Sequence, residues 1–178
     1  DTPPDLLRTM EGIDERFQEL PRVERYRASK AFYEKLLAEH PREIRVFAKY
    51  GEFLQFTLRG DWPAERDRWV ARAAGGDTMA LTLAAMALVG KDTPRALRLL
   101  DEAVRKEPGY GPAWLQEVSI YRGGKFVDTA RAGQAVASYF AACPDSTDSQ
   151  ALAFAGQFGS KELQQQVARQ LRNRLEGA

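Results

Sequence analysis

Residues 77–109 read DTMALTLAAMALVGKDTPRALRLLDEAVRKEPG and contain two apolar stripes separated by a short polar turn. Within the stripes, apolar side chains recur every three or four residues, which is the spacing of a helix packed on one face. Asp77 and Asp92 precede the stripes, where a short carboxylate can accept a hydrogen bond from the free first-turn amides. The segment therefore predicts two consecutive helices. Other helix starts are indicated by three short polar side chains: Asp61, Asp128 and Ser160.

Similar stripes continue in both directions, and the breakers between them are periodic. Pro41, Gly75, Pro108 and Pro144 lie 34, 33 and 36 residues apart. A fixed period of roughly 20 to 50 residues is typical of stacked helical units. We therefore expect one all-α domain over residues 1–178, built of about five helix pairs. The approximate pairs are 5–40, 42–75, 77–108, 111–144 and 147–177.

The side chains within these pairs resemble the tetratricopeptide repeat (TPR), which carries W-x2-L-G-x2-Y in its first helix and A-x3-F, then Ala and Pro, in its second. The first-helix pattern is matched twice, by Trp114 with Tyr121 and by Phe47, Tyr50, Gly51 and Leu54. The second-helix pattern is matched by Ala96, Leu100, Ala103 and Pro108, after a reduced first helix at Ala80, Leu83, Ala84 and Ala87. Toward the ends the matches reduce to Tyr33, Leu36 and Pro41 and to Leu152, Ala155 and Gly156.

This resemblance implies a right-handed α-α superhelix, or TPR-like solenoid, in which each small helix pair covers the next. Sel1-like and half-a-TPR arrays stay open as relatives with the same mechanism. In such arrays the first helices line a concave groove and the second helices cover the convex side. The implied function is that of a protein-protein interaction scaffold that binds a peptide segment or helix in this groove.

First-helix positions that point away from the packing pattern are predicted to form the partner-binding groove. They are Arg45, Lys49, Glu52, Gln55, Phe56, Leu81, Leu88, Leu115, Ser119 and Arg122. The three leucines of this set are expected to give apolar contact to the bound segment. Its three cations are expected to hold polar or acidic groups of that segment.

The charge of the chain is nearly balanced, with 26 basic and 25 acidic side chains. No long basic face is predicted, so nucleic acid is not an expected partner.

The longest apolar stretch, Met79 to Val89, is far shorter than the roughly 20 residues that span a membrane. The chain starts at Asp1 with no initiator methionine or signal peptide, which suggests a processed protein or a domain excised from a longer one. A single cysteine leaves both cytoplasm and periplasm open, and 19 arginines against 7 lysines favour a bacterial source.

Few side chains offer catalytic chemistry. The sequence has one histidine and one cysteine, and it lacks the HExxH, GxSxG and GxxxxGK[ST] motifs. His40 and Cys143 each stand at the predicted end of a helix, where a capping or structural role is expected. We therefore expect a protein that is no enzyme and that uses no cofactor and no metal.

Two other interpretations stay open. The chain could be a regulatory or spacer module of a larger multidomain enzyme, with a thioredoxin-like or transferase domain outside this chain. It could also self-associate through the C-terminal helix, whose apolar stripe is Leu163, Val167, Leu171 and Leu175. The competing expectation for this stripe is a capping helix folded back on its neighbour, because the opposite face is polar.

Overall fold

The computed structural model describes residues 2–57 and 61–176, apart from the side chains of Asp14, Arg174 and Leu175. Every regular element in these ranges is a helix, so the predicted all-α class is confirmed. The helices are α1 (Pro4–Glu11), α2 (Ile13–Arg16), α3 (Arg22–Glu39), α4 (Ile44–Thr57), α5 (Trp62–Arg72), η1 (Ala73–Gly75), α6 (Thr78–Leu88), α7 (Thr93–Lys106), α8 (Gly111–Tyr121), η2 (Gly124–Phe126), α9 (Thr129–Ala142), α10 (Ser149–Phe158) and α11 (Lys161–Glu176). None of these described helices has both the length and the apolar character that a membrane crossing requires.

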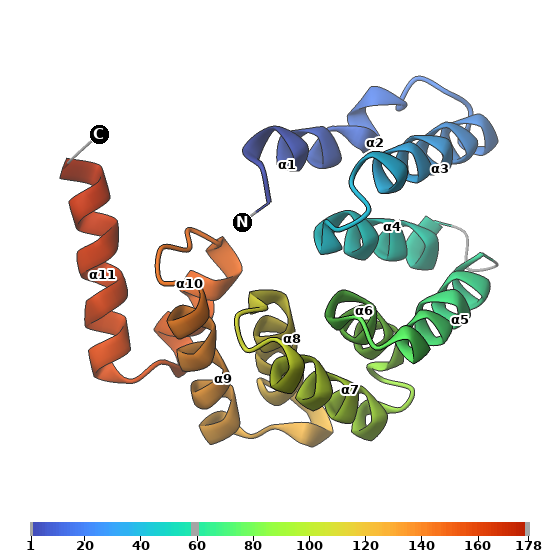
Figure 1. The fold of residues 1–178 in the computed structure, drawn as a ribbon. Coiled ribbons are helices and arrows are strands. Elements are labelled where there is room, and N and C mark those ends of the chain that lie inside the picture. The colour runs from blue at the N-terminus through green and yellow to red at the C-terminus, as the bar shows by residue number, and fades with distance from the viewer. Residues whose placement is uncertain (1, 58–60, 177–178) are drawn as a thin grey trace.

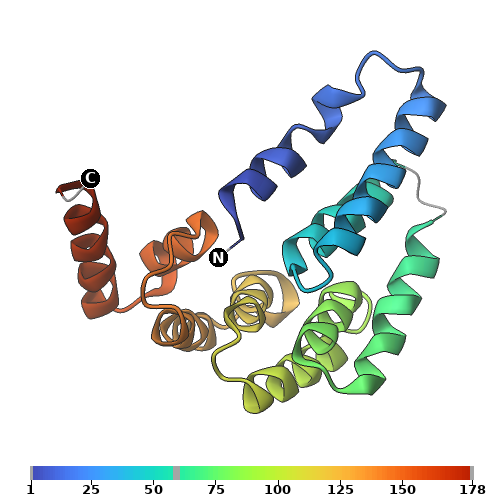
Figure 2. The ribbon, with the colours of Figure 1, turned by 45° about the horizontal axis from the view of Figure 1, so that its top comes forward.

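The helices follow one another in space in the order of the sequence. Figure 1 shows them arranged around an open arc, from α3 through α6 and α8 to α11. Each helix packs chiefly on the helices before and after it, and α6 also contacts α4 and α8. In both views the start of the chain lies near α10 (Figures 1 and 2). The first residues therefore approach a segment from the last third of the chain.

Short polar side chains begin several helices, as the sequence predicts. The amide three residues later donates a hydrogen bond of 3.0 to 3.2 Å to each of the side chains of Asp77, Asp92, Asp128 and Ser160. Each bond satisfies one of the first-turn amides that a helix leaves without an internal partner. The boundaries around α6, α7, α9 and α11 are thus set by local chemistry that can be read from the chain.

The prediction that Asp61 caps α5 with its side chain is wrong. Its backbone is already helical, with φ −85° and ψ −24°, whereas a capping residue usually has an extended backbone. The carboxylate instead accepts hydrogen bonds from Nζ of Lys30 at 2.7 Å and from the hydroxyl of Tyr26 at 2.8 Å. These two bonds lower the pKa of Asp61. Asp61 therefore ties the beginning of α5 to α3.

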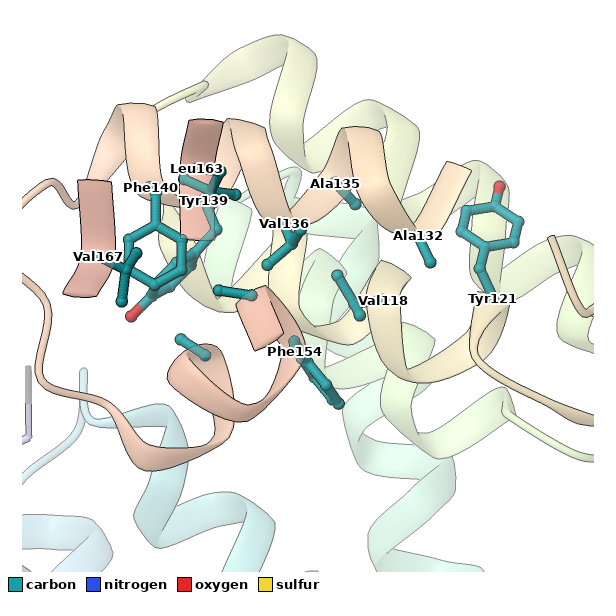
Figure 3. Close-up of a cluster of buried hydrophobic side chains, with 12 residues drawn as sticks. Val118, Tyr121, Ala132, Ala135, Val136, Tyr139, Phe140, Phe154, Leu163 and Val167 are labelled. Carbon is teal, nitrogen blue, oxygen red and sulfur yellow. The ribbon is translucent and has the colours of Figure 1, made fainter. Parts of the chain in front are cut away.

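The last helix packs on its neighbours through one half of its apolar stripe. Figure 3 shows Leu163 and Val167 of α11 beside Phe140 of α9, in the cluster that also includes Phe154 of α10. Leu163 and Val167 are 9% and 7% exposed, whereas Leu171 is 37% exposed. This burial favours the capping role of α11. The side chain of Leu175 lies outside the described residues, and self-association through α11 stays a prediction.

Gly51 of α4 allows the indole of Trp69 in α5 to lie against the helix backbone. A β-carbon at Gly51 would stand 2.7 Å from Cη2 of Trp69 and 3.1 Å from Cζ3 of Trp62. Trp69 is only 2% exposed, and its Nε1 donates a hydrogen bond of 2.9 Å to Glu65. Because the indole is enclosed and held by this bond, it has little room to move away from a larger residue.

Glu117 of α8 is a buried carboxyl group, with 7% of its surface exposed. Burial raises the pKa of Glu117 from about 4.5 to about 7, the negative charge of Asp101 adds to the rise, and Arg131 opposes it. The folded state therefore keeps the proton to a higher pH than the unfolded chain does. The stability that results is fully present below pH 4.5 and is lost as the pH rises through about 7.

We expect Gly51→Ala to lower the free energy of unfolding by about 1–3 kcal/mol, because the added methyl group overpacks the contact with the two indoles. The matched control is Gly156→Ala in α10, where a β-carbon meets nothing within 4 Å. This control should gain about 0.5–1 kcal/mol, because alanine is the better helix former. Urea unfolding followed by circular dichroism measures both changes. Equal stability gains in the two variants would contradict the close contact at Gly51.

We expect Glu117→Gln to change the pH dependence of stability, because glutamine binds no proton in either state. At each pH, the free energy of unfolding of the natural chain is subtracted from that of the variant. This difference should be about 2–3 kcal/mol larger at pH 8 than at pH 5. Urea unfolding of both proteins at the two pH values measures this difference. Glu24→Gln, at an exposed position of α3, should show no such difference. If the stability difference between Glu117→Gln and the natural chain were the same at both pH values, the pKa of Glu117 would not be raised by folding.

Candidate binding site

A cavity of about 310 Å³ lies between the beginnings of α4 and α10, with α8 along one side. Its apolar walls come from Ile44 and Ala48 of α4, Met86 of α6, Leu115 of α8 and Tyr139 of α9. The first two are four residues apart on one helix, so their side chains share a face. The cavity therefore lies between every second helix of this region, α4, α6 and α8, and the loop that connects α9 to α10.

Gly111 brings the first turn of α8 close to the end of α9. A β-carbon at Gly111 would stand 2.9 Å from Sγ of Cys143 and 2.9 Å from Cε2 of Tyr139. Cys143 ends α9, is half-buried and lines the cavity. The sequence predicts a helix end at Cys143, but its pattern carries no signal that the thiol faces a cavity.

An ion pair between Arg45 and Asp148 crosses the site. Arg45 belongs to the first turn of α4, and the carboxylate of Asp148 also accepts a hydrogen bond of 2.9 Å from the amide of Ala151 in α10. The side chain of Asp148 is 5% exposed and that of Arg45 is 37% exposed. The pair therefore joins two helix beginnings that are far apart in the sequence. Asp148 is a site residue that the sequence analysis missed, although its place before a helix is a recognisable capping signal.

A second acidic side chain of the lining, Glu43, joins the start of the chain to α4. The hydroxyl of Thr2 donates a hydrogen bond of 2.9 Å to Oε1 of Glu43, and the amide of Arg45 donates one of 3.3 Å to the same oxygen. Thr2 and Glu43 both line the cavity. The carboxylates of Glu43 and Asp148 are thus both held by hydrogen-bond donors of the protein.

Tyr110, which precedes α8, places an unsatisfied polar group beside the cavity. Its hydroxyl is buried and has no hydrogen-bond partner among the described residues. Burial raises the pKa of Tyr110, the carboxylates of Asp77, Glu107 and Glu43 raise it further, and Arg42 opposes them. The hydroxyl is therefore neutral at physiological pH, and more negative than positive charges surround it.

The structure brings three of the predicted groove residues together at the cavity: Arg45, Leu115 and Ser119.

Other predicted groove residues lie outside the cavity lining. Lys49 and Glu52 lie farther along α4 and pair with each other at 3.0 Å. Gln55 and Phe56 are exposed near the end of α4, outside the cavity lining. Phe56 is 84% exposed. Arg122 follows α8, with its guanidinium 5.7 Å from the ring centre of Phe154.

Leu81 and Leu88 of α6 do not face the cavity. They are 1% and 7% exposed, and both belong to the core cluster that includes Leu100 of α7 and Ile120 of α8. The reason is that α6 is buried on nearly every side, so its apolar residues pack against neighbouring helices. Met86, which is half-buried, is the residue of α6 that reaches the cavity lining.

The lining combines apolar surface, hydrogen-bonding groups and charged side chains of both signs. Besides its apolar wall, the cavity presents the side chains of Arg42, Gln116, Ser119 and Gln150. The hydroxyl of Ser119 donates a hydrogen bond of 3.0 Å to the carbonyl of Leu115 in its own helix. Within residues 2–57 and 61–176, no three His, Cys, Asp or Glu side chains form a group that could hold a metal ion.

Comparison of the chain with protein-family models, with curated proteins and with solved structures finds no match in any of the three.

Proposed function

We propose that this chain is a TPR-like solenoid that binds a segment or helix of another protein on its concave side, and that it carries out no chemistry itself. The observation that carries the proposal is the cavity between α4, α8 and α10. In the proposed solenoid these three are first helices of their pairs, as is α6 between α4 and α8, and first helices line the concave face in such arrays.

The packing order supports the solenoid part of this proposal. Each helix contacts chiefly its neighbours in sequence, and α4, α6 and α8 also touch in turn. This is the pattern expected when each helix pair covers the next pair. Together with breakers spaced 34, 33 and 36 residues apart, it favours a right-handed superhelix of about five pairs.

The size and composition of the cavity support segment binding. A volume of about 310 Å³ is near the lower end of the range for ligand pockets, roughly 300 to 1,000 Å³. Such a space suits one or two side chains of a longer segment, and Ile44, Met86 and Leu115 give it an apolar surface. Beyond the cavity, Lys49, Glu52 and Gln55 leave a polar, exposed surface along α4 for the rest of the segment.

Peptide display on the purified chain tests this proposal. Panning a random peptide library should enrich peptides that bind the chain with micromolar dissociation constants, about −8 kcal/mol. Ala48→Phe, which fills the cavity from α4, should weaken these peptides at least about tenfold, equivalent to about 1.4 kcal/mol. The matched control is Ala137→Phe, at an exposed position of α9 outside the cavity lining, and it should leave binding unchanged.

Fluorescence anisotropy of labelled peptides measures the affinities, and thermal melts verify that both variants are folded. If no peptide is enriched, the result contradicts the proposal that the chain binds a peptide segment. If the enriched peptides bind Ala48→Phe as well as they bind the natural chain, segment binding takes place elsewhere.

A further inference from the structure

The apolar core of the described chain does not join α4 to α10, although both helices contribute to the cavity. The buried apolar residues of α10 belong to one cluster with residues of α8, α9 and α11. Those of α4 belong to two other clusters, with residues of α1 to α3, α5 and α6. In addition, α4 and α10 are not among the helix pairs that pack closely on each other. The two helices therefore meet at the cavity as parts of separately packed groups.

The ion pair between Arg45 and Asp148 links these two groups of helices, and both of its partners line the cavity. Each partner is positioned on its own side. The amide of Arg45 donates a hydrogen bond to Glu43, and the carboxylate of Asp148 accepts one from the amide of Ala151. Because the two charged side chains are in contact, the main chain of a peptide cannot pass between them while the pair exists.

This ion pair contributes little net free energy to the contact between α4 and α10. The side chain of Arg45 is partly exposed, so water weakens its attraction to the carboxylate. The side chain of Asp148 is buried and has lost most of its hydration, which opening of the pair would restore. Attraction and lost hydration therefore largely offset each other, and a modest gain from segment binding is enough to open the pair.

We propose that the ion pair between Arg45 and Asp148 is a clasp that closes the concave side, and that a partner segment binds fully only when the clasp opens. In the closed state the segment has only the cavity of about 310 Å³, which suits one or two side chains. In the open state α4 and α10 move apart, and the main chain of the segment lies between them. This inference rests on the proposed function, because it names the regulation of the same site.

Two clasp variants each remove one charge of the pair. Arg45→Met removes the cation and leaves the carboxylate unpaired. Asp148→Asn removes the negative charge and keeps a side chain that caps a helix about as well as aspartate does, so the beginning of α10 is preserved. The matched control is Arg8→Met, which breaks an exposed ion pair with Asp5 within α1 and links no separate helices. Thermal melts verify that all three variants are folded.

The distance between α3 and α10 reports on the clasp without any ligand. Spin labels are attached at Ala38→Cys, an exposed position of α3, which packs on α4, and at Gln157→Cys, an exposed position of α10. Cys143→Ser removes the natural thiol, and double electron–electron resonance measures the distance between the labels. Both clasp variants should give longer and more broadly distributed distances than the natural pair does, and the control variant should give the natural distance.

The peptides enriched by display test the regulatory role of the clasp. Closure reduces the apparent affinity of a segment in proportion to the fraction of molecules that are open. Both clasp variants should therefore bind the peptides about tenfold more tightly, as expected when about one natural molecule in ten is open. The control variant should bind them as the natural chain does. Addition of peptide to the spin-labelled natural chain should lengthen the distance between the labels.

Two results would overturn this inference and leave the proposed function intact. One is a distance between the labels that is the same in the natural chain and in both clasp variants. The other is peptide binding by the clasp variants that is no tighter than that of the natural chain, which would make the ion pair a fixed part of the binding wall. A chain that enriches no peptide would contradict the proposed function and the regulation together.

Discussion

The burial of α6 on nearly every side is the constraint on which the rest of the structure depends. Ten of its residues, from Thr78 to Leu88 with the exception of Met86, are buried. A helix that is apolar all round cannot face water, so it must be enclosed by other helices. Its neighbours α4, α5, α7 and α8 provide that enclosure. Of these neighbours, α4 and α8 line the cavity, which α6 reaches through Met86.

Local chemistry allowed much of the fold to be predicted from the sequence. Helix starts at Asp77, Asp92 and Asp128 depend on a side chain and an amide three residues away, so no distant contact is needed to recognise them. Asp61 is an exception because Tyr26 and Lys30, far away in sequence, take its carboxylate. Helix boundaries are therefore predicted best where the decisive contact joins residues that are close in the sequence.

The candidate site was harder to predict, because it depends on how the helices curve around one another. Periodicity identifies the apolar residues of α6 but cannot tell a groove from an interior when all sides are apolar. It therefore predicts a groove position for Leu81 and Leu88, which the structure buries in the core. The partner of Arg45 could not be deduced either, since Asp148 belongs to a distant helix start. The missing partner of the buried Tyr110 hydroxyl likewise becomes visible only in the structure, because it depends on which side chains surround it.

The ion pair between Arg45 and Asp148 also has a mechanical consequence. In a row of helices that touch only their neighbours, the terminal units can peel away one after another under tension, and the inner ones respond independently. The ion pair between Arg45 of α4 and Asp148 before α10 links the two ends of the segment that contains α5 to α9. Tension applied to the two ends would load this ion pair in parallel with α5 to α9, so the pair would have to break before those helices could be drawn apart.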